Sequence, residues 1–231
     1  MEQNEQVRLS ALSNASMLSA IGVTVTLMYG LSLLLALLAP ASVAVGVVSL
    51  IGLILWLVGI YNTSSAFKGL NAAVAASFER LFKAQLVIVI AVVAYWVLII
   101  LIPQILGYKG AKASIVIIKL LTIALFVCSI MYMAKSNKEC RTLKGLGLKS
   151  MGTASIAFTI QLVILAVSAL IAVIALFRTG DFLSFLIGDG LGGAVVLTIL
   201  MGLAALVAAV FMIIGWWSVR NELPLLSADE K

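Results

Sequence analysis

The sequence predicts an all-α integral membrane protein, a bundle of six transmembrane helices arranged as three hairpins. Of its 231 residues, 64% are hydrophobic and only 10% are charged, and the mean hydropathy is +1.24. A soluble domain carries about 25% charged residues, so too few are present here to cover a water-exposed surface. Six apolar stretches are also long enough to cross a hydrocarbon layer about 30 Å thick. We therefore expect residues 1–231 to form a single transmembrane domain.

The six stretches have the length of transmembrane helices, about 20 residues each. We place the spans at Met17–Leu38, Ser42–Tyr61, Ala84–Leu106, Ser114–Ala134, Ala154–Phe177 and Ala194–Trp217. The third and fourth are rich in β-branched residues, which would favour strands in water. In lipid an isolated strand leaves its backbone polar groups unpaired, so we expect helices throughout.

Lys and Arg residues are divided unevenly between the two predicted sides. Eleven of the fifteen fall in the N-terminal segment, in the loops after spans two and four, and in the C-terminal segment. The other side holds Lys109, Lys112, Lys119 and Arg178. Because cytoplasmic loops carry the excess of basic residues, we expect both termini in the cytoplasm. The net charge of +6 then reflects orientation, and we expect no nucleic-acid partner.

The segment Ala66–Lys83, between the second and third spans, is amphipathic. Its apolar residues recur at steps of three and four: Phe67, Leu70, Val74, Phe78 and Leu81. Its polar residues lie mostly on other faces: Lys68, Asn71, Glu79 and Lys83. This spacing is typical of a helix that lies in the membrane interface. We expect an interfacial helix that runs into the third span.

The residue types needed for catalysis are largely missing. The chain has no histidine, which excludes haem ligation by His, zinc sites that use imidazole, and a Ser-His-Asp triad. No Asp or Glu lies within a predicted span, whereas proton relays use such carboxylates. No glycine-rich phosphate loop or metal-ligand spacing is present. We expect neither enzymatic activity nor a cofactor.

Lys119 is the basic residue that falls inside a predicted span, near the outer end of the fourth. Its stem is long enough to carry the ammonium to the interface, so one interpretation is a snorkelling side chain. The other is a contact site for an anion or a lipid headgroup, to which the neighbouring Lys109 and Lys112 would contribute. Both interpretations stay open.

Small residues form a stripe on the second span: Ser42, Gly46, Ser49, Gly52 and Gly59. Such faces let helix backbones approach closely in lipid. We expect this stripe to pack against another helix of the bundle and not to line a substrate path.

The stretch Ile51–Asn62 follows a first helical hairpin and leads into the amphipathic linker. It resembles a family of uncharacterised, mainly archaeal membrane proteins that carry domain of unknown function 996. The resemblance covers Ser10–Lys83. It implies a multi-pass protein of a prokaryotic plasma membrane and assigns no functional residue.

Three functions stay open on this pattern. The first is an accessory or structural subunit of a larger membrane complex, such as a respiratory or other energy-converting one, in contact with the bilayer and with partner subunits or further copies of itself. The second is a small transporter or channel for an anion, a lipid or another small solute, with Lys119 on the route. The third is a lipid-binding scaffold built on Ala66–Lys83 and the basic loop after span four.

Overall fold

A computed structural model of the protein describes residues 2–36, 43–106, 111–178 and 191–228. These residues fold into α-helices joined by short turns, with no strand among them. The helices are α1 (Glu2–Ala36), α2 (Val43–Phe67), α3 (Ala72–Leu106), α4 (Ala111–Gly145), α5 (Met151–Arg178) and α7 (Leu191–Ala228). The predicted all-α class is confirmed.

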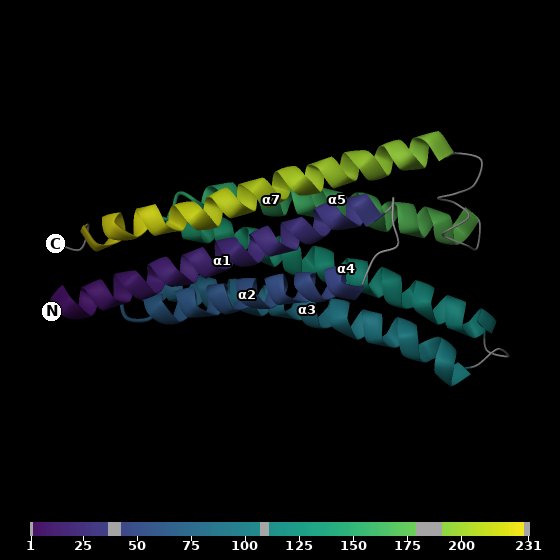
Figure 1. Ribbon diagram of the computed structural model, residues 1–231, viewed down its shortest axis with the longest axis horizontal. Helices are drawn as coiled ribbons and strands as arrows, with labels where there is room; N and C mark the ends of the chain where they lie inside the picture. The colour runs from purple at the N-terminus through teal and green to yellow at the C-terminus, as the bar shows by residue number, and fades with distance from the viewer. Residues whose placement is uncertain (1, 37–42, 107–110, 179–190, 229–231) are drawn as a thin grey trace.

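The helices described in the structure close into a ring. Each packs against two others: α2 lies between α1 and α3, α4 between α3 and α5, and α7 between α5 and α1. Figure 1 shows α1 running between α7 and α2, where the first and last helices of the chain meet. Both chain ends lie at the same end of the molecule, which we call the basal end; the opposite end is the distal end.

Four of the described helical segments are long and apolar enough to cross a membrane: Ala72–Leu106, Ala113–Gly145, Met151–Ile171 and Leu200–Glu222. A shorter apolar helix covers Ile51–Phe67. A membrane-embedded helical protein is thus supported. The first two predicted spans include residues 26–50, whose side chains lie outside the described set. The arrangement of six spans in three hairpins therefore stays a prediction.

At the basal end the helices extend beyond the predicted spans. The first helix begins at Glu2 and not at Met17, and α4 continues past Ala134 to Gly145. These extensions are polar overall, but apolar side chains at helical spacing are buried inside them, such as Leu12 and Leu143. Burying one such side chain contributes about 1.5–3 kcal/mol, so the segments pack as helices where tails and loops were expected.

The segment Ala66–Lys83, expected to form an interfacial helix that runs into the third span, is divided between the end of α2 and the start of α3. The second helix ends at Phe67, and α3 runs without interruption from Ala72. The Asn71 side chain caps the start of α3, because its Oδ1 accepts hydrogen bonds from the backbone amides of Ala73 at 3.1 Å and Val74 at 3.2 Å. The apolar face packs into the bundle, with Phe78 and Val74 fully buried. The position of this segment at a membrane interface stays a prediction.

Aromatic side chains fill the inside of the ring at the basal end. The rings of Phe67 and Phe78 stack with centroids 5.7 Å apart, and Phe78 contacts Trp216 at 5.8 Å. Because α3 and α7 are not adjacent in the ring, the Phe78–Trp216 contact crosses its interior. The dense core of the described residues therefore lies at the basal end.

The distal part of α3 is packed very differently. From Leu86 to Leu106, no side chain that the structure describes is buried. Large apolar side chains are exposed there, with Ile100 at 57% and Ile105 at 77% of their full accessibility. Val116 and Leu120 of the adjacent α4 are exposed as well. The bundle thus combines a close-packed basal block with apolar helices that diverge toward the distal end (Figure 1).

Candidate functional site

The three lysines of the predicted anion site are not brought together in the described part of the structure. Lys119 lies on α4 and is half-buried. Lys109 lies outside the described residues, and the side chain of Lys112, at the start of α4, is also outside them. The anion or headgroup contact expected at these lysines therefore stays a prediction.

The predicted packing stripe lies on α2, and the part of it that the structure describes faces α1. Gly52 and Gly59 are buried. A methyl group added at Gly59 would lie 2.6 Å from the backbone nitrogen of Ser19. The other three residues of the stripe lie outside this description. Ser42 is outside the described residues, and the surroundings of Gly46 and Ser49 are not described.

Gly22 of α1 completes this contact from the other side. A methyl group there would lie 2.8 Å from the carbonyl oxygen of Gly52 and 2.7 Å from the Cα atom of Trp56. The two helices therefore touch backbone to backbone. Sequence reasoning missed Gly22, although the small residues Ala15 and Ser19 at a spacing of four on the same helix were a signal for such a face.

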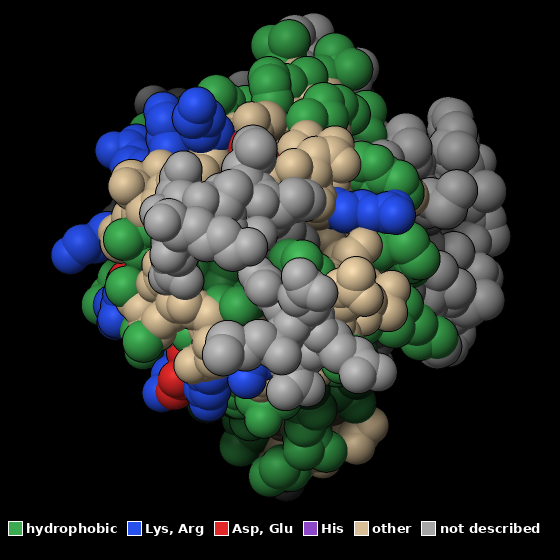
Figure 2. Space-filling view, turned by 90° about the vertical axis from the view of Figure 1, so that its left-hand side faces the viewer, with side chains coloured by type: hydrophobic (Ala, Val, Ile, Leu, Met, Phe, Trp, Pro, Cys, Tyr) green, Lys and Arg blue, Asp and Glu red, His purple; other side chains and the backbone are tan. Residues whose placement is uncertain are grey.

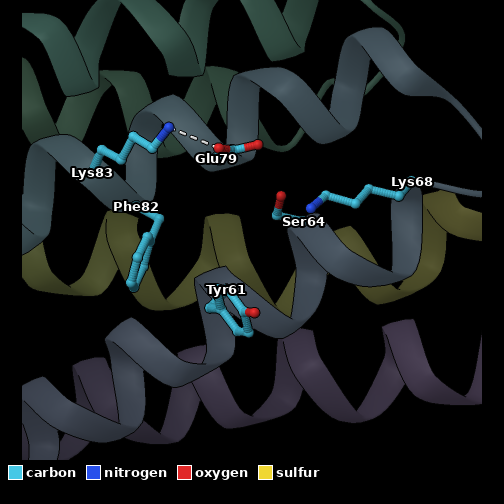
Figure 3. A pocket seen from close by; sticks show the side chains of 6 residues that line it. All are labelled: Tyr61, Ser64, Lys68, Glu79, Phe82 and Lys83. Carbon is cyan, nitrogen blue, oxygen red and sulfur yellow. Dashed lines mark ion pairs between the residues drawn. The ribbon is translucent and has the colours of Figure 1, made fainter.

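A small cleft of about 130 Å³ opens between α2 and α3 at the basal end. We call it the lysine cleft; its lining residues are Tyr61, Ser64, Lys68, Glu79, Phe82 and Lys83. Figure 3 shows Ser64 and Lys68 on one wall, Glu79 and Lys83 on the facing wall, and the rings of Tyr61 and Phe82 together at one side. Charged and aromatic side chains from two helices thus converge on one opening.

The packing of α2 on α3 builds this cleft. The hydroxyl of Ser64 donates a hydrogen bond of 3.0 Å to the backbone carbonyl of Ala75, which ties the last turns of α2 to the first turns of α3. The rings of Tyr61 and Phe82 pack in a tilted geometry with centroids 5.5 Å apart. Both walls are therefore held by contacts made within the bundle.

The lysine cleft carries a net positive charge. Lys83 pairs with Glu79 at 2.7 Å, one helical turn away on α3. Lys68 has no ion-pair partner among the described residues, and the neighbouring Arg80 is engaged elsewhere, at 3.0 Å from Glu139 of α4. Two lysines against one glutamate leave an excess of one positive charge. Exposed ion pairs such as Lys83–Glu79 contribute little to stability, so both lysines can turn toward a ligand.

A second group of polar side chains, partly buried, joins α4 to α5. The Asn137 side chain donates to the Thr159 hydroxyl at 3.0 Å and accepts from the Ser155 hydroxyl at 2.6 Å. Arg141 also donates to the Ser155 hydroxyl, at 3.3 Å. Because every member is bonded to another, this network is satisfied and holds the two helices together.

A wider groove of about 510 Å³ lies between α1 and α2. It is lined by Ala11, Asn14, Ala15, Leu18, Asn62, Ser65 and Ala66. No charged side chain lines it, so it offers less definite ligand chemistry than the lysine cleft. In the described part of the chain, no three Cys, Asp or Glu side chains are placed to hold a metal ion.

Comparison of the chain with protein-family models, with curated proteins and with solved structures finds no match. The similarity to domain of unknown function 996 therefore stays a resemblance. Function has to be inferred from the geometry of the described residues, above all from the lysine cleft and from the exposed distal helices.

Proposed function

We propose that the protein is a non-catalytic, multi-pass membrane protein that serves as an accessory or structural subunit of a larger membrane complex. The observation that carries this proposal is the exposure of α3 between Leu86 and Leu106, where no described side chain is buried. The partner would bind along this distal half and along the adjacent face of α4.

Exposed apolar side chains on this half of α3 point in more than one direction. Neighbouring residues of a helix point in directions about 100° apart, yet both Ile100 and Leu101 are exposed, as are Ile105 and Leu106. A helix that is apolar all round is suited to burial on every side. Within the described chain, α4 covers one face of this half, where the hydroxyls of Tyr95 and Thr122 lie 2.8 Å apart. Helices of another subunit would cover the remainder through close packing.

The basic residues at the basal end support the orientation that we propose. Most described Lys and Arg side chains are near this end, and Figure 2, which looks onto it, shows them around the rim. The group consists of Arg8, Lys68, Arg80, Lys83, Lys135, Lys138, Arg141, Lys144, Lys149 and Arg220. Basic residues favour the cytoplasmic side. We therefore propose six spans in three hairpins, with both termini in the cytoplasm and the plasma membrane of a prokaryote as the location.

Purification from the native membrane tests the proposed function. The tagged full-length protein is extracted in a mild detergent, and its mass and companions are measured by native mass spectrometry. We expect other membrane proteins, or further copies of this chain, in stoichiometric amounts. A protein that is monomeric in detergent and remains uncross-linked in intact membranes would show that the proposal is wrong.

Paired variants locate the interface. Substitution of Ile100 and Ile105 by Trp places bulk on the distal half of α3 and should reduce recovery of the partner. Val163 on α5 is similarly exposed, so Val163→Trp is a matched control that should leave recovery unchanged. Equal recovery with both sets of variants would exclude α3 as the binding face.

A further inference from the structure

We propose that the lysine cleft binds the headgroup of an anionic phospholipid whose phosphodiester is linked to a hydroxyl-bearing alcohol, of the kind found in phosphatidylglycerol. This binding site does not depend on the accessory-subunit function. It would place a specific lipid between α2 and α3 at the basal face of the bilayer.

The cleft lies at the depth where headgroups are found. On α3, Lys83 is the last charged residue before the apolar run that begins at Ala84 and continues to Leu106. On α2, Tyr61 follows the apolar stretch that begins at Ile51. Tyr side chains are enriched at the membrane–water interface. Both helices therefore change from apolar to charged at the level of the cleft.

Exposed apolar side chains continue from the cleft along both helices toward the distal end. On α2 they recur at helical spacing before Tyr61, at Val58, Ile54 and Ile51. On α3 they follow Lys83 at steps of seven residues, about two helical turns, at Ile90 and Val97. The cleft itself is too small for acyl chains, but this double track offers them a continuous apolar surface. This apolar surface can contact the acyl chains of a lipid, whereas a soluble phosphate has no apolar part to contact it.

The charges match a phosphodiester with a free hydroxyl. The ammonium groups of Lys68 and Lys83 supply donors to phosphate oxygens, and a phosphodiester carries one negative charge against the net single positive charge of the cleft. The ionised Glu79 carboxylate has no proton to donate and can only accept hydrogen bonds. A hydroxyl group in the lipid headgroup would supply the donor. A phosphate monoester carries about −1.5 to −2 charges, so Glu79 would repel it more strongly.

Native mass spectrometry of the full-length protein tests this site. The protein is titrated with phosphatidylglycerol, with phosphatidylcholine as the zwitterionic comparison, and bound lipids are counted for the wild type and for Lys68→Gln and Lys83→Gln. A basic residue near a membrane surface contributes ~1 kcal/mol to anionic lipid binding, which corresponds to about a fivefold loss of affinity per lysine removed. Phosphatidylcholine binding should not change.

Lys144→Gln is the matched control. Lys144 is exposed at the end of α4 and stands in the same Lys-Gly-Leu sequence as Lys68, but it does not line the cleft. It should retain wild-type affinity for phosphatidylglycerol. An equal loss in all three lysine variants would indicate general attraction to the basic basal end and would overturn the site. Circular dichroism on heating confirms that each variant is folded.

Two further arms identify the source of the phosphate. Inorganic phosphate added up to millimolar concentration should not displace phosphatidylglycerol; displacement dependent on Lys68 would identify a soluble anion as the ligand and refute the lipid proposal. Glu79→Gln removes the carboxylate and should raise affinity for phosphatidic acid, a monoester, relative to phosphatidylglycerol. An unchanged ratio would exclude the proposed role of Glu79 in headgroup selection.

Discussion

The carboxylate of Glu222 on α7 accepts hydrogen bonds from Ser150, the residue that precedes the first residue of α5. One oxygen accepts a hydrogen bond of 2.8 Å from the Ser150 backbone amide, and the other accepts one of 2.8 Å from the Ser150 hydroxyl. The first amides of a helix have no partner within it, and a negative charge is favourable beside them. This contact fastens α5 to α7 at the basal end, next to the core around Trp216.

Replacing Glu222 by Gln should lower the free energy of unfolding by about 1–2 kcal/mol, because a charge-assisted hydrogen bond to a partly buried amide becomes a neutral one. Denaturant unfolding in detergent, followed by circular dichroism, measures the change. Glu79→Gln is the control, since its exposed pair with Lys83 should contribute little to stability. Equal effects of the two substitutions would contradict the capping role.

Gly59→Ala should destabilise the protein by about 1–3 kcal/mol, the usual cost of added bulk at a tight contact. The new methyl group would meet the hydroxyl of Ser19 on α1 and also its backbone, with the backbone nitrogen 2.6 Å away. The hydroxyl can rotate away, but the backbone of a packed helix cannot. Thermal unfolding of the purified protein provides the measurement. Gly145→Ala is the control, because no atom outside its own helix lies within 4 Å of the added methyl group, and it should be neutral or slightly stabilising.

The apolar helices were predictable from the sequence. The polar helical segments, which are buried only by neighbouring helices, were less predictable. The apolar runs predicted helices that the structure contains, whereas Leu12 and Leu143 lie in polar segments whose burial depends on the other helices of the ring. The polar face with Lys68, Glu79 and Lys83 was also visible. Its partners in the cleft, Tyr61 and Ser64, belong to α2. The sequence of one helix does not determine which other helix packs against it, so this cleft was not predicted.

The adjacent tryptophans of α7 should respond very differently to truncation. Trp216 is fully buried against Phe78, whereas Trp217 is 50% exposed. Trp216→Ala should therefore cost about 3–5 kcal/mol through the cavity that it leaves, and Trp217→Ala much less. Denaturant unfolding in detergent compares the two variants. The indole nitrogen of Trp216 has no hydrogen-bond acceptor within the described structure, so Trp216→Phe should cost less than Trp216→Ala. A cost for Trp217→Ala as large as that for Trp216→Ala would refute this placement of the core.

Gln85 of α3 and Ser136 of α4 should be energetically coupled. The Gln85 amide donates a buried hydrogen bond of 2.6 Å to the Ser136 hydroxyl, at the level where the basal block gives way to the apolar helices. A double-mutant cycle with Gln85→Met and Ser136→Ala isolates this bond. In membranes such bonds average about 0.6 kcal/mol and reach about 1.7 kcal/mol.

The control cycle combines Gln85→Met with Ser155→Ala, since Ser155 bonds to Asn137 and not to Gln85. Independent sites should add within about 0.3–0.5 kcal/mol. The free energies of unfolding of all variants, measured in the same detergent, decide the outcome. Coupling for the Ser136 pair alone is expected if this bond joins α3 to α4. Coupling of equal size in both cycles would mean that Gln85→Met disturbs the whole basal block, and the direct bond would then contribute nothing separable.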